Sequence, residues 1–405
     1  MANSGQSTAN RNLSKAKTNK NDEFYTQYED IEKEINAYLD YDPNVFFNKT
    51  ILLPCDDPEW SNFTRYFAQN FVRFGLKKLI STSYAPNRKI YKEDYQPSLF
   101  ESKDPQFDAS KALNNGKIFT LTKDKSGDGK IDIDDLEWSY LEGDGDFRSE
   151  EIEKLRNEAD MIITNPPFSL FREFLAWIVE ADKKFVIIGN MNAITYKEVF
   201  PLIKENRMWL GATGNSNDMV FAVPAGAEVK ESDRQKAAKL GYIGDYTRLG
   251  NSCWFTSFEH GRRHQPLQLM TMEDNLRFNN RMKGNSAYEV YDNYDAIEIP
   301  FTNAIPRDYD GVMGVPISFL DKYNPDQFEI LGATQRGCHD EVPDTKKYDD
   351  YVEVRQNGER TGSSGGKTNE NTNIAKNDGK KNYFINKDGH IVQSTYQRIF
   401  IRHKK

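Results

Sequence analysis

The sequence is poor in cysteine and histidine. Its 405 residues contain three cysteines, Cys55, Cys253 and Cys338, and five histidines. Three cysteines cannot form the disulfide framework of a small secreted domain, so a reducing compartment is expected. The histidines and cysteines do not follow the ligand spacing of a zinc site, and the sequence therefore predicts no zinc module.

Long apolar runs are also missing. The longest are short, such as residues 185–188, whereas a membrane-spanning helix needs about 18 or more apolar residues. The first 20 residues lack the apolar segment of a signal peptide. We therefore expect no association with a membrane and a cytoplasmic location.

The net charge is −8, from 54 basic and 62 acidic side chains, and it excludes a protein that coats nucleic acid with a uniformly basic surface. The charge is unevenly distributed. Residues 1–20 carry four basic side chains and no acidic one, residues 351–405 carry eleven and five, and residues 21–350 therefore carry −18. Two basic ends flank an acidic body. Such ends can be solvated tails or can contact phosphate groups, and charge alone does not decide between them.

Short apolar strands alternate with helices through much of the chain. Helical spacing of apolar residues predicts helices over 30–39 and 63–74. Strands are expected at six apolar runs: 50–53, 78–81, 161–164, 185–188, 219–223 and 253–255. This alternation predicts an α/β fold with a doubly wound parallel sheet, which binds ligands at the carboxyl ends of its strands. The loops 54–58 and 165–168 follow predicted strands and are candidate binding loops.

Polar segments divide the chain. Residues 1–20 are rich in Ser, Asn and Lys and are expected to form a flexible basic arm. Residues 85–140 are polar and irregular, like an insertion, and residues 343–381 have little capacity to form a core. We therefore expect the arm to be followed by a main domain over 21–265, which contains the insertion, and by a C-terminal region over 266–405.

Asn165-Pro166-Pro167-Phe168 is the most informative tetrapeptide. The lone pair of an exocyclic amine is conjugated into its ring, so its methylation requires hydrogen-bond acceptors for both N–H groups, which turn the lone pair towards a methyl donor. The side-chain oxygen of Asn165 and the carbonyl of Pro166 can be these acceptors, the prolines fix the carbonyl directions, and Phe168 can stack on a planar base. This chemistry requires no metal. The alternative is a simple proline turn that ends a strand. The position of the tetrapeptide between an apolar strand and a predicted helix favours the catalytic interpretation.

Several further segments resemble the EcoRI-type adenine-specific DNA methyltransferases, which use S-adenosylmethionine. They are residues 22–26, 55–58, 61–63, 143–148, 164–171, 194–200, 291–296 and 311–316. The resemblance implies a Rossmann-like doubly wound methyltransferase sheet with an appended C-terminal DNA-recognition region. It also implies direct methyl transfer from S-adenosylmethionine to N6 of a flipped adenine in double-stranded DNA. A restriction–modification system with a separate endonuclease and an orphan or phage enzyme both fit, and a monomer is the simpler expectation.

The resemblance also assigns residues to the cofactor. Phe24, Tyr25 and Thr26 are similar to the segment that meets the methionine end of S-adenosylmethionine. Asp56 and Asp57 stand where relatives commonly have a glycine-rich loop, and either carboxylate can pair with the cofactor's ammonium group. A pair of helix-capping acids is the alternative explanation for these two residues.

Asp146 and Phe147 resemble the pair that holds the cofactor's adenine, with the Asp accepting from the amino group and the Phe packing on the ring. A Gly/Asp turn is the alternative explanation. The acid that usually follows the second strand and binds the ribose is missing, and Ser-Thr-Ser-Tyr stands at 81–84 instead. Ribose recognition therefore stays unassigned.

Basic residues near both ends are the candidate DNA contacts. The resemblance places selection of the target sequence in the C-terminal region, including the loop around 355–381. The candidates are Arg11, Lys15 and Lys17 in the arm and Arg277, Arg281, Lys283 and Lys367 in the C-terminal region. Solvation of the surface is the alternative explanation for each single cation.

Two other motifs suggest different chemistry. Pro54-Cys55 is the dipeptide of cytosine-C5 methyltransferases, but two adjacent carboxylates disfavour a thiolate, so we do not expect a catalytic Cys55. Residues 124–135 match a calcium-binding loop. Its ligand positions are occupied by Asp124, Ser126, Asp128, Asp132 and Asp135. A hairpin turned by residues 126–129 explains the same residues without a metal.

Other substrates and a non-catalytic function stay open. Tetrapeptides of this kind also serve methyltransferases that act on RNA adenine or on protein glutamine, whose amide poses the same chemical problem. A non-catalytic DNA-binding module that retained the fold is a further alternative. The basic ends and the additional EcoRI-type segments favour DNA, and the intact tetrapeptide argues against loss of catalysis.

Overall fold

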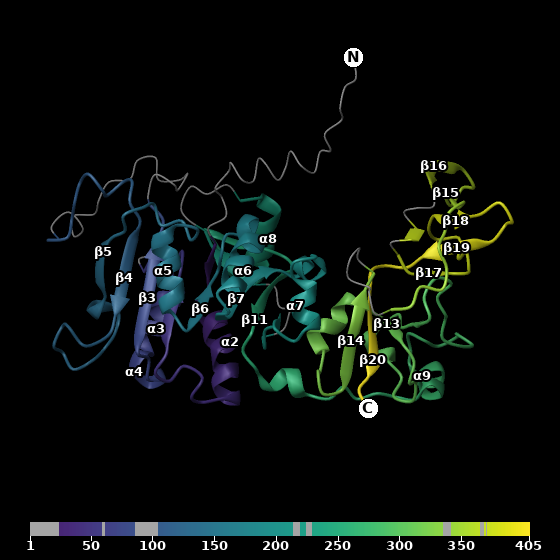
Figure 1. Cartoon of the computed structure of the whole chain (residues 1–405), viewed down its shortest axis with the longest axis horizontal. Helices are drawn as coiled ribbons and strands as arrows, with labels where there is room; N and C mark the ends of the chain where they lie inside the picture. Colours follow the sequence, from purple (N-terminus) through teal and green to yellow (C-terminus); the bar gives the residue numbers. More distant parts are fainter. Residues whose placement is uncertain are drawn as a thin grey trace, which may run out of the picture. The chain divides into compact units, whose positions relative to one another are not determined.

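The computed structural model describes residues 24–58, 61–85, 104–213, 219–223, 229–334, 342–364, 368–369 and 371–405. The chain divides into two compact units. Unit 1 consists of residues 1–193 and 210–261, and unit 2 of residues 194–209 and 262–405. Both units contain helices and sheets (Figure 1), so the prediction of an α/β protein is confirmed.

An eight-stranded sheet has the strand order β5-β4-β3-β2-β6-β7-β11-β8. Its strands are β2 (Thr50–Leu53), β3 (Lys78–Ser83), β4 (Lys117–Leu121), β5 (Glu137–Tyr140), β6 (Met161–Thr164), β7 (Lys184–Asn190), β8 (Trp209–Leu210) and β11 (Ser252–Thr256). β3, β2, β6 and β7 are parallel, and β4, β5 and β11 pair antiparallel with their neighbours. The parallel strands are almost wholly buried, which explains their continuous apolar runs.

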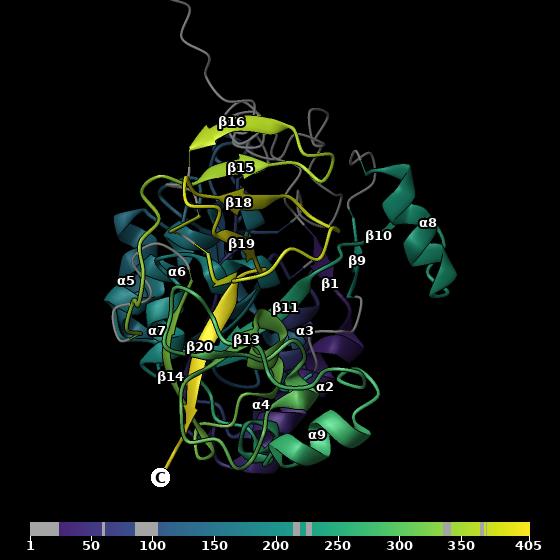
Figure 2. The same ribbon diagram turned by 90° about the vertical axis from the view of Figure 1, so that its right-hand side faces the viewer.

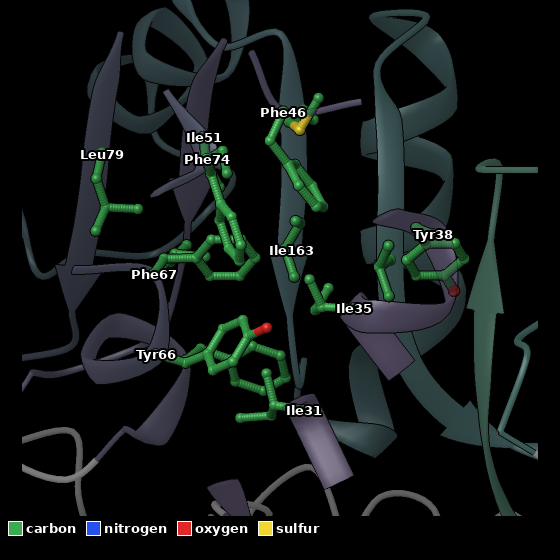
Figure 3. Packing of buried hydrophobic residues seen from close by; sticks show 14 of the residues in the cluster. Ile31, Ile35, Tyr38, Phe46, Ile51, Tyr66, Phe67, Phe74, Leu79 and Ile163 are labelled. Atoms are coloured by element: carbon green, nitrogen blue, oxygen red, sulfur yellow. The ribbon is translucent and has the colours of Figure 1, made fainter. Parts of the chain in front are cut away.

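Helix α2 (Tyr28–Tyr41) packs through one apolar stripe. Its buried Ile31, Ile35 and Tyr38 recur at helical spacing. Figure 3 shows them in the same buried cluster as Ile51 of β2 and Ile163 of β6. The burial of this stripe against the strands holds α2 in place.

Two consecutive helices, α3 (Asn62–Gln69) and α4 (Phe71–Phe74), occupy the segment where the sequence predicted one helix. α3 begins at Ser61, whose hydroxyl accepts a hydrogen bond from the N–H of Phe63. Asn70 separates the helices, and α4 ends at Gly75, which has a φ of +61°. A side chain at Gly75 would be strained and would meet the ring of Phe47 at 2.7 Å, so this helix end favours glycine.

The segment expected to be an irregular insertion contributes two strands. β4 pairs antiparallel with β3, and β5 pairs antiparallel with β4, so the two strands extend the main sheet. The strand at 117–121 agrees with the predicted hairpin alternative, whereas the expectation of irregular structure is wrong for residues 137–140. Except for the buried Leu121, their side chains are only partly buried, because the two strands lie at one end of the strand order.

A three-stranded sheet also belongs to unit 1. It joins β1 (Tyr25–Thr26), β9 (Val220–Ala222) and β10 (Tyr246–Arg248), with β9 antiparallel to both neighbours. Helix α8 (Glu231–Lys239) lies between β9 and β10 in the sequence. The predicted strand at 219–223 therefore exists, but it pairs with β1 instead of joining the parallel sheet.

Unit 2 contains a sheet with the order β12-β13-β20-β14 and another with the order β16-β15-β18-β19-β17. In Figure 2 the strands β16, β15, β18 and β19 are seen stacked one above another. The elements are α7 (Phe200–Lys204), α9 (Met272–Phe278), β12 (Ile297–Glu298), β13 (Met313–Pro316), β14 (Phe328–Ala333), β15 (Val352–Val354), β16 (Arg360–Ser364), β17 (Asn373–Ile374), β18 (Tyr383–Ile385), β19 (Ile391–Ser394) and β20 (Arg398–His403). Three of these strands lie within 343–381, where the sequence predicted little core.

No helix in the described parts of the chain is both long and apolar enough to cross a membrane.

Candidate active site

Two loops leave the parallel sheet next to each other. β2 and β6 are adjacent and parallel, so residues 54–58 and 165–168 emerge at the same edge. β3 lies on one side of β2, whereas β6 and β7 lie on the other side, so the strand order reverses between β2 and β6. Open α/β sheets bind their ligands in the crevice at such a reversal.

Asp56 is a buried carboxylate at this edge. Asp56 is only 5% exposed. One carboxylate oxygen accepts a hydrogen bond from the Ser61 hydroxyl at 2.7 Å, and the other lies 2.6 Å from the Thr164 hydroxyl. Burial raises the pKa of Asp56 to about 7, although both hydroxyls favour the charged form, and neighbouring Asp57 contributes to the rise. Asp56 therefore changes its charge near neutral pH.

Hydroxyl groups also hold the backbone of this loop. The side chains of Thr64 and Ser81 both hydrogen-bond the carbonyl oxygen of Asp56. The Thr164 hydroxyl lies 2.7 Å from the carbonyl oxygen of Pro54. These contacts come from α3, β3 and β6. They keep the loop in a conformation in which Cys55 has a left-handed φ of +71°, which side chains rarely adopt.

Asn165 follows β6 directly. Its Nδ2 donates a hydrogen bond to the carbonyl oxygen of Phe24 at 2.6 Å. A carbonyl oxygen can only accept, so this contact fixes which end of the amide carries the oxygen. Among the described residues, Oδ1 of Asn165 is buried without a hydrogen-bond partner. Such an acceptor is costly, and it suits the N–H group of a ligand.

A pocket of about 420 Å³ adjoins these groups. Its lining residues are Phe24, Tyr25, Thr26, Cys55, Asp56, Ser61, Phe63, Tyr84, Asn165 and Pro167. Pairing of β1 with β9 positions Tyr25 and Thr26, and the Asn62 amide donates to the Thr26 carbonyl at 2.8 Å. The hydroxyl oxygen of Thr26 is another buried polar atom that has no partner within the described segments. A buried carboxylate, two unsatisfied oxygens and several aromatic rings suit a ligand that carries an ammonium group and an aromatic ring.

The predicted catalytic tetrapeptide lies at this pocket. Pro166 is buried, and Pro167 lines the pocket beside Asn165. The ring of Phe168 is half-buried, with its centroid 5.8 Å from that of Phe24. Helix α6 (Phe171–Glu180) follows after one short turn. The structure therefore places the tetrapeptide between a strand and a helix, as the sequence predicted.

The two adjacent acids differ in their positions. Asp56 lines the pocket, whereas Asp57 is half-buried and is not among the lining residues. Tyr84, which follows β3, completes the wall near Cys55. Burial raises the pKa of Tyr84 well above its usual value, and a hydrogen bond with Cys55 raises it further. Tyr84 stands in the segment where the sequence lacks the acid that binds a ribose.

Asp146 and Phe147 are held by contacts within the protein. The Asp146 carboxylate receives two hydrogen bonds from the Arg148 guanidinium, at 2.8 and 2.6 Å. The residue Phe147 is 1% exposed, and its ring packs edge-on against Phe174 and Trp177 of α6. Neither residue is among those that line the pocket.

Gly145 brings this loop close to the end of β3. It has a φ of +83°, and a Cβ atom there would lie 2.4 Å from the carbonyl oxygen of Ser83. The next contact is a hydrogen bond from the Ala85 N–H to the Asp144 carbonyl at 2.9 Å. Only glycine permits this approach, which places residues 144–146 beside the segment that contains Tyr84.

The calcium-like loop connects β4 and β5, which pair as a hairpin. Its carboxylates accept hydrogen bonds from backbone N–H groups. Asp135 binds the N–H groups of Lys125, Ser126 and Asp132, and Asp124 binds those of Gly127 and Gly129. Within the described residues, no group of three or more His, Cys, Asp or Glu side chains is placed to hold a metal ion.

The candidate DNA contacts fall into two groups. Arg11, Lys15, Lys17 and Lys367 lie outside the described residues. Arg277, Arg281 and Lys283 are exposed on unit 2. Two of them lie over aromatic rings, Arg277 over Phe278 at 5.0 Å and Arg281 over Phe301 at 4.7 Å.

The sequence assigned no role to Thr164 or Tyr84. Thr164 is the last residue of β6 and is fully buried, yet its hydroxyl contacts both the carbonyl of Pro54 and the carboxylate of Asp56. A polar residue that ends an otherwise apolar strand beside a binding loop is a usable sequence signal for such a contact. Tyr84 carries the same signal, since it directly follows the strand adjacent to β2.

Comparison with known proteins defines the class of enzyme. The Type II methyltransferase M.EcoRI of Escherichia coli is 43% identical over 327 residues, which are 80% of this chain and 90% of that protein. The Type II methyltransferase M.MpnI of Mycoplasma pneumoniae is 33% identical over 321 residues, which are 79% of this chain and 84% of that protein. No solved structure matched the chain.

The chain belongs to the family described as adenine-specific methyltransferase EcoRI, which matches residues 12–404. It is an adenine-specific DNA methyltransferase, and the resemblance that the sequence motifs indicated is confirmed. The Type II methyltransferase M.MgeORF184P of Mycoplasma genitalium supports the same family, with 31% identity over 345 residues, 85% of this chain and 92% of that protein.

Proposed function

We propose that the chain methylates N6 of an adenine within a specific sequence of double-stranded DNA, with S-adenosylmethionine as the methyl donor. One observation carries this proposal. Oδ1 of Asn165 is buried without a partner among the described residues, while Nδ2 of the same amide is held by Phe24. The oxygen is thus oriented in advance and has an unused capacity to accept a hydrogen bond from an amine.

Asn165 acts on the amino group of the target adenine. Oδ1 accepts one N6–H group, and the carbonyl oxygen of Pro166 accepts the other. Together they draw the N6 lone pair out of conjugation and aim it at the methyl donor. Because Phe24 fixes the amide, little reorganisation is needed when charge develops on N6. No residue becomes covalently attached to the base in this scheme.

The pocket is the proposed cofactor site. S-adenosylmethionine, when bound, supplies an electrophilic methyl group. The Asp56 carboxylate would hold the ammonium group of its methionine end, and Phe24, Tyr25 and Thr26 would surround that end. Asp57 and the pair Asp146–Phe147 stay weaker candidates, because they do not line the pocket.

The target base must leave the DNA helix to reach Asn165. Extrusion of a base costs a few kcal/mol of stacking and pairing energy. We propose that Phe168 offsets part of this cost by stacking on the extruded adenine, since its ring is only half-buried.

The other parts of the chain supply DNA binding. We propose that the main domain, 21–265, is a Rossmann-like doubly wound methyltransferase domain, and that the region 266–405 selects the target sequence. The arm, 1–20, and the cations Arg277, Arg281 and Lys283 would contact phosphate groups. One chain carries every required part, which supports a monomer that acts separately from any cognate endonuclease.

Product analysis tests this function. The purified chain is incubated with unmodified plasmid DNA and S-adenosylmethionine, the DNA is digested to nucleosides, and a second sample undergoes modification-aware sequencing. N6-methyladenine at one sequence motif is the expected result. Methylation of RNA or of protein glutamine but not of DNA would contradict the proposal, and so would specific DNA binding without any methylation.

A further inference from the structure

The turn between β19 and β20 of unit 2 presents two exposed side chains. Residues 395–397 connect the strands, and Tyr396 is 74% exposed. Gln397 is exposed as well. Together they offer an aromatic surface beside an amide that can both donate and accept hydrogen bonds.

A buried ion pair makes this turn rigid. Arg398 is buried, and its guanidinium forms hydrogen bonds with the Glu298 carboxylate. The same guanidinium donates to the carbonyl oxygens of Tyr396 and Gln397, at 3.3 and 3.2 Å. On the other side of the turn, the Thr395 N–H donates to the carbonyl of Thr372 at 2.8 Å. Exposed side chains on a fixed backbone lose little entropy when they bind.

The turn borders a large hollow within unit 2. Its volume is about 1310 Å³, and its walls include Phe301, Lys376, Lys381, Gln393, Tyr396 and Gln397. Arg281, which lies over the ring of Phe301, stands next to this wall. The hollow therefore combines amide groups, aromatic rings and cations, which are the side chains that bind bases and phosphates.

The acids that line the hollow are engaged within the protein: Glu289 with Lys376, Glu298 with Arg398, and Asp378 with the Gln393 amide. Lys381 lies with its ammonium group 4.5 Å from the centre of the Tyr396 ring. The segment 376–381 carries three lysines and one acid. With Lys376 paired to Glu289, Lys380 and Lys381 still outnumber Asp378, so this segment keeps a net positive charge beside the turn.

We propose that the turn of Tyr396 and Gln397, together with Lys381, reads the target DNA. Gln397 hydrogen-bonds a base edge, for which its paired donor and acceptor fit adenine. Tyr396 packs against the DNA at the same place, and Lys381 contacts a phosphate group. This inference deepens the proposed function and rests on it, because the substrate is the same double-stranded DNA.

The sequence motif of the product DNA tests this assignment. Full-length wild type, Gln397→Ala and Tyr396→Ala are incubated with unmodified plasmid DNA, and modification-aware sequencing reports the motif and the extent of methylation. Gln397→Ala should raise methylation at sites that differ from the motif at one base by roughly tenfold, the scale of one lost base contact. Tyr396→Ala should lower methylation at the motif itself by about tenfold. Gln268→Ala, an exposed glutamine of unit 2 outside the hollow, is the matched control and should change neither.

Two further measurements separate recognition from folding. Binding of S-adenosylhomocysteine, measured by calorimetry, should be the same in all four proteins. Lys381→Ala should reduce the salt dependence of binding to a duplex that carries the mapped motif by about one phosphate contact. An unchanged motif and extent of methylation in both variants would overturn the proposal, and so would a joint loss of methylation and S-adenosylhomocysteine binding. Absence of N6-methyladenine with the wild type would instead contradict the proposed function.

Discussion

The hydroxyl oxygen of Thr164 lies 2.6 Å from the carboxylate of Asp56 and 2.7 Å from the carbonyl oxygen of Pro54. A hydroxyl has one proton, and a carbonyl can only accept. When Thr164 donates to Pro54, the contact with Asp56 requires a proton on the carboxyl group. When Asp56 is ionised, Thr164 can donate to it instead. The charge of Asp56 therefore decides which oxygen receives the hydrogen bond from Thr164, the residue that precedes Asn165.

Cofactor binding should strengthen as the pH rises. The pKa of Asp56 is raised by burial to about 7, and its ionised form attracts the ammonium group. The affinity for S-adenosylhomocysteine should therefore increase about tenfold between pH 6 and pH 8, as the ionised fraction grows. Calorimetry in two buffers with different ionisation enthalpies should also detect proton release at pH 6. Asp56→Asn should bind weakly with no such pH dependence, and an unchanged pH profile would argue against Asp56 as the ammonium ligand.

The same carboxyl group should limit stability at alkaline pH. An aspartate in an unfolded chain has a pKa of about 3.9, and the folded value is raised to about 7. The folded state therefore holds the proton more tightly, and the stability that this provides is lost as the pH rises from about 4 through 7. Asp56→Asn cannot ionise, so thermal unfolding should occur several degrees higher in this variant at pH 8. Near pH 4 the two proteins should unfold at similar temperatures, and a constant difference would contradict the assignment.

Thr164→Val should affect both stability and the pH profile. The substitution removes a buried hydroxyl that serves Pro54 and Asp56, at a cost of about 1–3 kcal/mol. Because the hydrogen bond from Thr164 lowers the pKa of Asp56, its loss should move the midpoint of cofactor binding to higher pH. Thr164→Ser keeps the hydroxyl and serves as the control. Equal binding midpoints for the two variants would show that Thr164 does not influence the charge of Asp56.

Asn165→Ala should separate catalysis from cofactor binding. It removes the acceptor for the target amine, so methyl transfer should fall at least ~10²-fold. Binding of S-adenosylhomocysteine should persist, because Asp56 and the aromatic wall are intact. Asn44→Ala, a change at an exposed asparagine, is the control for the assay. Near-normal turnover of Asn165→Ala in a single-turnover experiment would rule out the proposed mechanism.

Removal of residues 1–20 should weaken DNA binding. The segment carries four basic side chains and no acid, and each phosphate contact adds about 0.9 to the slope of log affinity against log salt concentration. The slope should therefore become shallower by up to about four contacts, while S-adenosylhomocysteine binding is unchanged. A truncated chain with the original slope would indicate a solvated tail. A double variant, Lys15→Ala with Lys17→Ala, should change the slope by about half as much as the truncation does.

Sequence patterns located the central strands accurately. β2 and β6 have the predicted boundaries, because a strand buried on both faces must be a short, continuous apolar run. The patterns failed at β5 and at β15–β17, which lack a continuous apolar run. Those strands are stabilised by pairing with distant segments, as β15 pairs with β18 and β17 with β19. Non-local pairing leaves little trace in local sequence.

The sequence likewise predicted some parts of the candidate site and not others. The tetrapeptide 165–168 was predicted from residue types, because methylation of an amine demands specific acceptors. The segment 24–26 was predicted only from the resemblance to the family. The sequence could not distinguish Asp56 from Asp57, since adjacent side chains differ only in direction. Burial beside Ser61 and Thr164 makes the difference, and these residues are brought to Asp56 from α3 and β6.

The sequence by itself determined the enzyme family and the candidate catalytic motif, because both depend on residue identity at fixed spacing. Only the tertiary structure decided how those residues work together. It placed β2 beside β6, oriented the Asn165 amide through a contact with Phe24, and raised the pKa of Asp56 by burial. It also fixed Tyr396 and Gln397 above a buried ion pair whose partners, Glu298 and Arg398, are separated by 100 residues in the chain. Desolvation and hydrogen-bond geometry depend on neighbours that are distant in sequence, so they follow from the fold and not from local pattern.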